Sequence, residues 1–123
     1  MSWEAYVAML DDSTMGAAVI SAEGALCAKS ENFKGQQADF IQWGKYLKDP
    51  PLARQHGVSY GEKKLFAVEY SNDFLYARCD DLCLFIKKSK SVFVTGISDS
   101  GKSPDDAKAA VIRVSKILED AGV

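Results

Sequence analysis

Apolar residues near the start of the chain recur at the spacing of one helical face. They are Trp3, Tyr6, Val7 and Leu10. Ser2 can cap this helix, and the polar cluster at residues 11–13 ends it. Two short apolar runs follow, residues 17–21 and 25–30, and they flank a turn at residues 22–24 that contains glycine. The pattern predicts a short N-terminal helix and then a β-hairpin.

The middle of the chain changes from a helical pattern to a series of short β-rich runs. Phe40, Ile41 and Leu47 line one side of a helix predicted between residues 36 and 47, and the prolines at residues 50 and 51 prevent its continuation. Beyond Gly57, four β-rich runs cover residues 63–70, 74–79, 82–88 and 91–97. Their connections are too short for parallel crossovers, so they predict an antiparallel meander.

The last segment carries clear helix signals. Ser103 can act as N-cap with Pro104 at the first position, acidic residues occupy the first turn, and Gly122 follows the end. Ile112 falls on the charged side of the predicted helix, which runs from Pro104 to about Ala121. The apolar side comprises Ala107, Ala110, Val111, Val114, Ile117, Leu118 and Ala121. The element order predicts one α/β domain with a largely antiparallel sheet.

The composition is that of one globular domain. Of the 123 residues, 47% are hydrophobic and 26% are charged, so the chain is too short for two domains and too apolar to be disordered. The formal net charge is -2, and the isoelectric point is near 5.3. This balance argues against a protein that binds nucleic acid by attraction to its phosphates, so we expect no nucleic-acid partner.

The cysteines and the chain start indicate the compartment. Cys27, Cys79 and Cys83 are an odd number of thiols, and residues 1–4 have neither the basic nor the apolar region of a signal peptide. No apolar stretch approaches the roughly 20 residues that cross a bilayer. We therefore expect a soluble cytoplasmic protein with reduced thiols. A disulfide between Cys79 and Cys83 requires a turn that brings them close.

One motif suggests nucleotide binding. The segment from Gly96 to Ser103 fits the phosphate-loop spacing G-x-x-x-x-G-K-[ST], with Lys102 and Ser103 as the phosphate and magnesium ligands. However, only the last helix follows, so no parallel strand can return beside it. Asp99 places negative charge where phosphates would lie, and Pro104 lacks an amide donor. We interpret the segment as a polar loop with a helix cap, and a nucleotide-binding domain remains a remote alternative.

Catalytic and metal chemistry find little support in the residues. His56 is the only histidine, so no catalytic triad can be proposed from spacing. Cys79 and Cys83 lack the second cysteine or histidine pair that a zinc site needs. We therefore expect a protein that is not an enzyme and that holds no cofactor or metal.

Several stretches follow one another in an order found in one protein family. They are Met1-Ser2-Trp3-Glu4-Ala5-Tyr6-Val7, Gly16-Ala17-Ala18-Val19-Ile20 with Glu23-Gly24 and Ala28-Lys29-Ser30, Gly57-Val58-x-x-Gly61-x-x-Lys64, Ile86-Lys87-Lys88-Ser89, Gly96-Ile97, and Pro104 through Gly122. Together they resemble the profilins, small proteins that bind actin monomers, and residues 57–123 are similar to plant-type profilins almost without gaps. The resemblance implies one domain over residues 1–123. In it, a central antiparallel sheet carries the N- and C-terminal helices together on one face and shorter helices on the other.

The resemblance also implies a groove that binds proline-rich segments. Its positions here are Trp3, Tyr6, Cys27 and Ile117. Aromatic rings accept a preformed proline helix at low entropic cost, although Trp3 and Tyr6 would by pattern alone also suit the core. Cys27 stands where similar proteins usually carry a third groove tryptophan, and Ile117 where many carry a tyrosine. Each loss costs on the order of 1 kcal/mol, so we expect weak proline binding unless Trp43 or another aromatic residue substitutes.

Actin contacts are implied on the middle strands and the first half of the last helix. The matching positions are Lys64, Arg78, Lys87, Lys108 and Ile112. Surface lysines are ordinarily only solubilising. Ile112 is an isolated apolar residue on a polar helical face, where similar proteins often have glutamate. Phosphoinositide headgroups are a third implied partner, through the lysines of residues 63–64 and 87–90, for which a solubilising role is the plainer interpretation.

We interpret the chain as an actin-monomer-binding regulator of actin polymerisation, cytoplasmic and associated with the cytoskeleton. Its partners would be monomeric actin and, through a partly depleted poly-proline groove, proline-rich segments of actin-assembly proteins. The alternative is a scaffold of the same fold that has weak or lost binding of actin and of proline.

Overall fold

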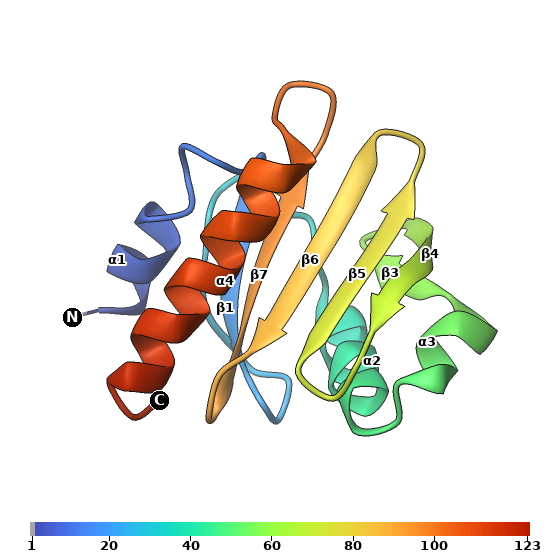
Figure 1. Ribbon diagram of the computed structural model, residues 1–123, viewed down its shortest axis with the longest axis horizontal. Coiled ribbons are helices and arrows are strands. Elements are labelled where there is room, and N and C mark those ends of the chain that lie inside the picture. Colours follow the sequence, from blue (N-terminus) through green and yellow to red (C-terminus); the bar gives the residue numbers. More distant parts are fainter. Residues whose placement is uncertain (1) are drawn as a thin grey trace.

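The computed structural model describes residues 2–123, which form a seven-stranded sheet with helices on both faces (Figure 1). Met1, the first residue of the stretch that resembles profilins, lies outside the described residues. The helices are α1 (Trp3–Ala8), α2 (Gln37–Lys48), α3 (Pro51–His56) and α4 (Pro104–Asp120). The strands are β1 (Gly16–Ser21), β2 (Leu26–Lys29), β3 (Val58–Tyr60), β4 (Lys63–Tyr70), β5 (Phe74–Cys79), β6 (Leu82–Lys88) and β7 (Val92–Ser98). Among residues 2–123, the structure contains no helix with the length and apolar character of a membrane span.

The sheet is antiparallel throughout, with the strand order β2-β1-β7-β6-β5-β4-β3. The predicted meander is confirmed as β4 to β7, and the predicted hairpin as β1 and β2. β1 pairs with β7, the last strand, from Gly16 opposite Ile97 to Ser21 opposite Val92. This long-range pairing joins the N-terminal hairpin to the meander, so segments from the two ends of the chain lie side by side.

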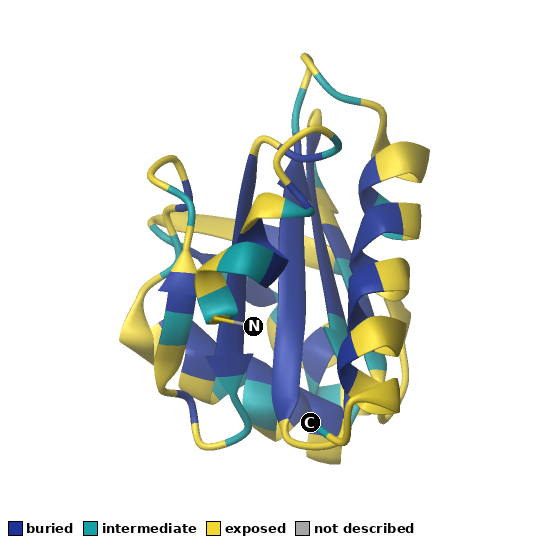
Figure 2. Cartoon of the chain, turned by 90° about the vertical axis from the view of Figure 1, so that its left-hand side faces the viewer, coloured by how far each residue is buried: buried dark blue, intermediate teal, exposed yellow. Residues whose placement is uncertain are grey.

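The sheet separates two hydrophobic cores. One core lies beneath α1 and α4 and includes Val19, Phe85 and Val94 from the strands. The other lies beneath α2 and α3 and includes the packed rings of Phe40 and Trp43. β7 is buried along its whole length and β6 along most of it (Figure 2). The predicted arrangement, with the terminal helices on one face and the shorter helices on the other, is confirmed.

α4 shows the predicted capping but buries a narrower stripe than predicted. The Ser103 hydroxyl accepts a hydrogen bond from the Asp106 N–H at 3.4 Å, and Gly122 adopts φ +86° after the helix end. Ile117 and Ala121, predicted on the apolar side, are exposed. The helix packs mainly on β6 and β7, so residues at the margin of the stripe lie beyond the sheet. Ser115 is buried in their place.

Three features of the middle segment differ from the prediction. Ile41 is exposed, because α2 turns Trp43 and Tyr46 toward the core instead. The two prolines that end α2 also start α3, since proline is well suited to the first turn of a helix. β3 was not predicted, because three residues are too few to show an alternating pattern.

At Gly96, α4 packs closely against the sheet. A Cβ atom there would lie 2.8 Å from Val111 Cγ2 and 2.9 Å from Thr14 Cγ2, and both residues are buried. We expect Gly96→Ala to destabilise the fold by about 1–3 kcal/mol in urea unfolding, because the core is overpacked. Gly101→Ala is the control, since its nearest neighbour is Met15 Sδ at 3.5 Å. Equal losses for the two variants would contradict this packing argument.

Candidate functional site

The first candidate surface lies along α1, beside β2 and α4, and we call it the α1–α4 surface. The rings of Trp3 and Tyr6 are 6.2 Å apart between centroids and inclined at 49°. Tyr6 is buried at 8% exposure, whereas Trp3 is half-buried. Ser2 caps the helix, as predicted, by accepting a hydrogen bond from the Ala5 N–H at 3.4 Å. The first helix therefore holds both aromatic rings, one inside the core and one at its margin.

The two other positions predicted for this surface come from β2 and α4. Cys27 is half-buried and, like Trp3, packs against the core beneath α1 and α4. Burial raises the pKa of the Cys27 thiol, which favours its protonated form. Ile117 is 38% exposed. The structure therefore joins Trp3, Tyr6 and Cys27 around one core and leaves the side chain of Ile117 accessible at the surface.

Trp43 does not lie at the α1–α4 surface. It is fully buried beneath α2, on the opposite face of the sheet, and its Nε1–H donates to the Ser59 carbonyl oxygen at 2.8 Å. Trp43 therefore does not supply the additional aromatic ring that would strengthen proline binding.

The second candidate surface lies on β4, β5 and the adjoining face of α4, and we call it the β4–β5–α4 surface. Phe66 is 74% exposed there and pairs with Arg78 across the two strands. Phe66, Val68 and Arg78 line a shallow hollow of about 420 Å³. Phe66 is not among the contact residues predicted from the sequence. The alternation of side chains along β4 could have identified it. Leu65 and Ala67 face the core beneath α2 and α3, so Phe66 between them projects from the opposite face of the sheet.

A β-bulge links this surface to α4. The register of β4 on β5 shifts between Ala67 and Glu69, so that Glu69 lies opposite Tyr76 and on the α4 side of the sheet. The carboxylate of Glu69 accepts from Lys108 Nζ at 3.2 Å. The same ammonium lies 5.3 Å from the centre of the Phe74 ring. Lys108 is thereby held over the strands.

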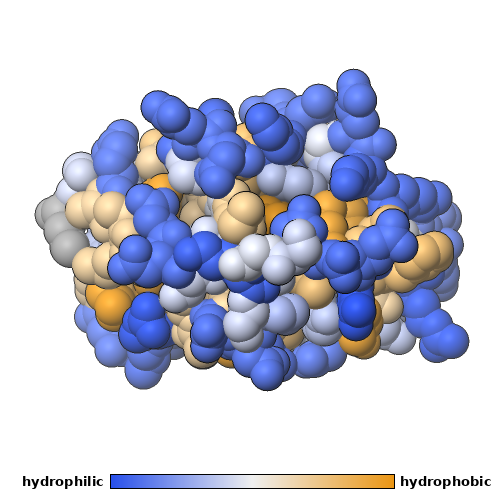
Figure 3. All heavy atoms as spheres, turned by 90° about the horizontal axis from the view of Figure 1, so that it is seen from above, coloured by the Kyte–Doolittle hydropathy of each residue, from blue (hydrophilic) through white to orange (hydrophobic). Residues whose placement is uncertain are grey.

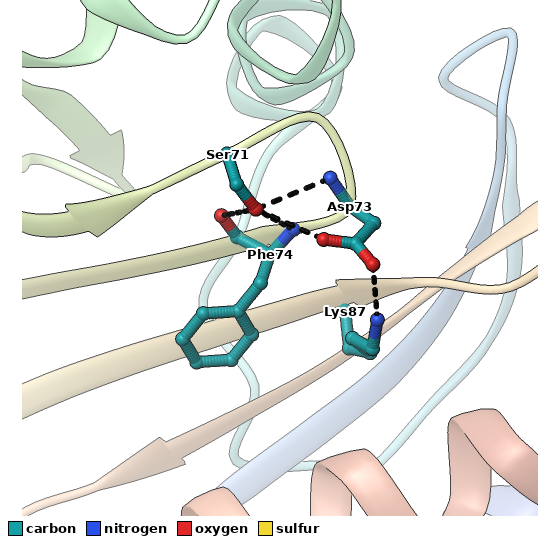
Figure 4. Close-up of polar contacts among 4 residues, drawn as sticks. All are labelled: Ser71, Asp73, Phe74 and Lys87. Atoms are coloured by element: carbon teal, nitrogen blue, oxygen red, sulfur yellow. Dashed lines mark hydrogen bonds and ion pairs between the residues drawn. The ribbon is translucent and has the colours of Figure 1, made fainter.

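Lys87 is held by the turn between β4 and β5 (Figure 4). Its ammonium donates to Asp73 Oδ2 at 2.7 Å, and the Ser71 hydroxyl donates to Asp73 Oδ1 at 2.9 Å. These two hydrogen bonds hold the pKa of Asp73 below its ordinary value. Lys87 is therefore ion-paired within the chain, as Lys108 is with Glu69, and its side chain is the less exposed of the two, at 22% against 37%.

The remaining predicted actin contacts are spread over this side of the sheet. Arg78 Nε donates to the Asp80 carbonyl oxygen at 3.0 Å. Ile112 is 39% exposed and follows Lys108 by one helical turn. Lys64 alternates with Leu65 on β4, so it projects on the same side as Phe66, and its side chain lies close to Gly57. The structure therefore places Arg78 beside Phe66 and Lys108 over Phe74. Lys87 lies opposite Phe74 on β6, and Ile112 lies one turn beyond Lys108 on α4.

The lysines considered for phosphoinositides do not form one patch. Lys63 and Lys64 are neighbours on β4, and Lys87 and Lys88 are neighbours on β6. Successive strand residues point to opposite faces of a sheet, so each pair is divided between the two faces. Phosphoinositide binding stays a prediction from the resemblance.

The segment with phosphate-loop spacing is a strand end, a turn and a helix cap. Gly96 lies within β7, opposite Phe85 and Ala17. Lys102 Nζ donates to the Asp12 carbonyl oxygen at 2.8 Å, and the Ser103 hydroxyl caps α4. The two side chains that a nucleotide would need are thus engaged within the chain. The cap at Ser103 was predicted, whereas the bond from Lys102 was not.

The cysteines are free thiols within the described residues. Cys79 packs against the core beneath α2 and α3, whereas Cys83 lies in the core beneath α1 and α4. The sheet therefore separates Cys79 from Cys83, and the turn between β5 and β6 does not bring them together. Among residues 2–123 no group of three histidine, cysteine or acidic side chains is placed to hold a metal ion.

Comparison with known proteins finds the fold and the family. Comparison with curated protein sequences returned no significant match. Among solved structures, Acanthamoeba castellanii profilin II matches with a TM-score of 0.93 and 19% identity, covering 99% of this chain and 100% of that chain. Mouse profilin IIa, solved with a double repeat from the FH1 domain of mDia1, matches with a TM-score of 0.78 and 17% identity, covering 100% of both chains. LokiProfilin1, solved in complex with rabbit actin, matches with a TM-score of 0.75 and 20% identity, covering 98% of both.

The family model for profilin matches residues 1–123, the whole of the chain. The fold expected from the resemblance and the family itself are thus confirmed, and profilins act by binding rather than by catalysis. The chain belongs to the profilin family.

Proposed function

We propose that this profilin binds monomeric actin through the β4–β5–α4 surface and so regulates actin polymerisation in the cytoplasm, in association with the cytoskeleton. The observation that carries the proposal is Phe66, a large aromatic side chain 74% exposed beside Arg78. A few aromatic and arginine side chains within a polar rim supply most of the free energy of protein interfaces. Lys108 and Glu69 provide such a rim. The likeness to LokiProfilin1, solved with rabbit actin, supports the same partner.

A second, weaker partner is a proline-rich segment at the α1–α4 surface. Trp3 and Ile117 offer accessible apolar surface there, and mouse profilin IIa was solved with a double repeat from an FH1 domain. The surface lacks a ring at Cys27 and a phenol at Ile117. We infer a groove that is partly depleted, with an affinity about tenfold or more below that of a groove carrying both aromatic side chains.

A scaffold of profilin fold without strong actin binding is the competing function. Ile112 favours it, because an exposed isoleucine replaces a polar contact that similar proteins often make through glutamate. The two functions separate in an assay of spontaneous actin polymerisation. An actin-binding profilin suppresses nucleation in proportion to its concentration, whereas a scaffold leaves the rate and the extent unchanged.

Lys108→Glu should weaken actin binding by about tenfold, because it reverses a charge at the rim of the β4–β5–α4 surface and places two carboxylates side by side there. Binding is measured by the fluorescence of labelled monomeric actin. Lys116→Glu is the matched control. Lys116 is also a lysine of α4 that pairs with an acidic residue, Asp120 at 3.2 Å, but it lies two turns farther along the helix. An unchanged affinity of the Lys108 variant would remove this residue from the interface.

Phe66→Ala should weaken actin binding by about tenfold or more, as expected for an exposed aromatic side chain at the centre of an interface. Its thermal midpoint should stay close to that of the parent protein, because the ring is mostly solvent-exposed. Ile41→Ala, which truncates an exposed apolar side chain on α2, is the control. If both variants bind actin like the parent protein, actin does not cover Phe66.

Cys27→Trp and Ile117→Tyr should each tighten binding of a proline decamer, by up to about tenfold, because each restores stacking area or a hydrogen-bond donor. Binding is measured by isothermal titration calorimetry rather than by tryptophan fluorescence, because Cys27→Trp adds a tryptophan. Ile112→Tyr, at a similarly exposed position of α4 outside the proposed groove, should bring no gain. Tight decamer binding by the parent protein would contradict the depleted groove.

A further inference from the structure

A cleft lies at the end of the sheet where β7 ends and β4 and β6 begin. Its volume is about 520 Å³, within the range of small-molecule sites. Tyr60, Leu82 and Ile97 form an apolar floor, each less than 10% exposed, and Met15 stands at the rim. Figure 3, which looks onto this end of the molecule, shows hydrophobic atoms between hydrophilic ones. The cleft thus combines an apolar base with a polar border.

One buried carboxylate holds two walls of the cleft. Asp39, only 4% exposed, accepts from the Gly61 N–H at 2.8 Å in the turn between β3 and β4, and from the Gln36 N–H at 2.9 Å in the loop before α2. Gly61 and Gln36 both line the cleft. A third link joins the same walls, because the Lys34 N–H donates to the Tyr60 hydroxyl at 2.8 Å. The cleft is therefore preorganised, which lowers the entropic cost of binding.

The lysines, Glu62 and Asp99 at the border together carry no net charge, but the positive charge is confined to one wall, where an anionic group would bind. Lys34 and Lys63 line the cleft on the wall made by the loop and the turn, and neither ammonium has an ion-pair partner within residues 2–123. Glu62 lies on the same wall, which leaves one net positive charge there. Asp99 lines the opposite wall, and one of its oxygens accepts from the Ser100 N–H at 2.8 Å. A ligand with an apolar body and one negative group would match both the floor and the lysines.

The cleft lies apart from the two surfaces discussed above. Its floor belongs to the core beneath α2 and α3, whereas Trp3 and Tyr6 pack on the opposite face of the sheet. Lys63 lines the cleft, while its neighbour Lys64 projects on the side of Phe66. Occupation of the cleft is therefore compatible with a protein partner on either surface.

We propose that this cleft is a third binding site, for a small amphiphile with an apolar body and a single anionic head group. The body covers Leu82 and Ile97, and the head group binds between Lys34 and Lys63.

The test uses three probes with the same eight-carbon body, namely octanoate, octanol and octylammonium, added to the full chain without any protein partner. Amide chemical shifts report the location of binding. Octanoate should shift the amides of Lys34, Gly61 and Ile97 saturably, and at least tenfold more tightly than the other two probes. Equal binding of octanol, tighter binding of octylammonium, or shifts centred on another surface would each overturn the proposal.

Charge reversal supplies the second measurement. The double variant Lys34→Glu with Lys63→Glu should weaken octanoate binding at least tenfold. Lys64→Glu, one residue away but on the other side of β4, should leave it within twofold. Circular dichroism and the thermal midpoint verify that each variant is folded. We expect the variants to fold, because Lys34, Lys63 and Lys64 are all exposed. Equal effects of the double variant and of Lys64→Glu would show that only the overall charge matters, and would overturn the assignment of the head-group site.

Discussion

The antiparallel pairing of β1 with β7 is the contact on which the rest of the structure depends. It runs from Gly16 opposite Ile97 to Ser21 opposite Val92 and joins residues that are 71 to 81 positions apart in the sequence. Because β7 leads directly into α4 and β1 follows α1, this pairing brings both terminal helices onto one face. The aromatic residues of α1 then share a core with α4. Without this pairing the hairpin and the meander would be separate pieces.

The same sheet gives the protein different chemistry on its two sides. On the α4 side, the bulge in β4 turns Glu69 toward Lys108, and the exposed ring of Phe66 lies among charged side chains. On the α2 side, Asp39 ties a loop and a turn together at one end of the strands, beside a cleft with an apolar floor. An extended surface with one exposed ring suits a protein partner, whereas a cleft with fixed walls suits a small molecule.

Local signals account for the parts that the sequence predicted well. The cap at Ser103, the proline after it and Gly122 define α4, and the short polar connections define the meander. The predictions were wrong where long-range packing decided the outcome. Ile41 and Ile117 have helical periodicity but lie beyond the area that the sheet covers. β3 was missed because it is stabilised mainly by its neighbours, through pairing with β4 and the bond from Trp43 to Ser59.

The sequence by itself determined the order of the main elements, apart from α3 and β3, together with the antiparallel meander and the family, because turns, caps and family motifs are short-range features of the chain. The tertiary structure alone decided which side chains meet. It buried Trp43 far from the groove that it was considered to complete, separated Cys79 from Cys83 by a sheet, and engaged Lys87 with Asp73. It also exposed Phe66 and enclosed the cleft beside Lys34. These outcomes depend on strand register and on contacts between distant segments, which a pattern read along one chain does not contain.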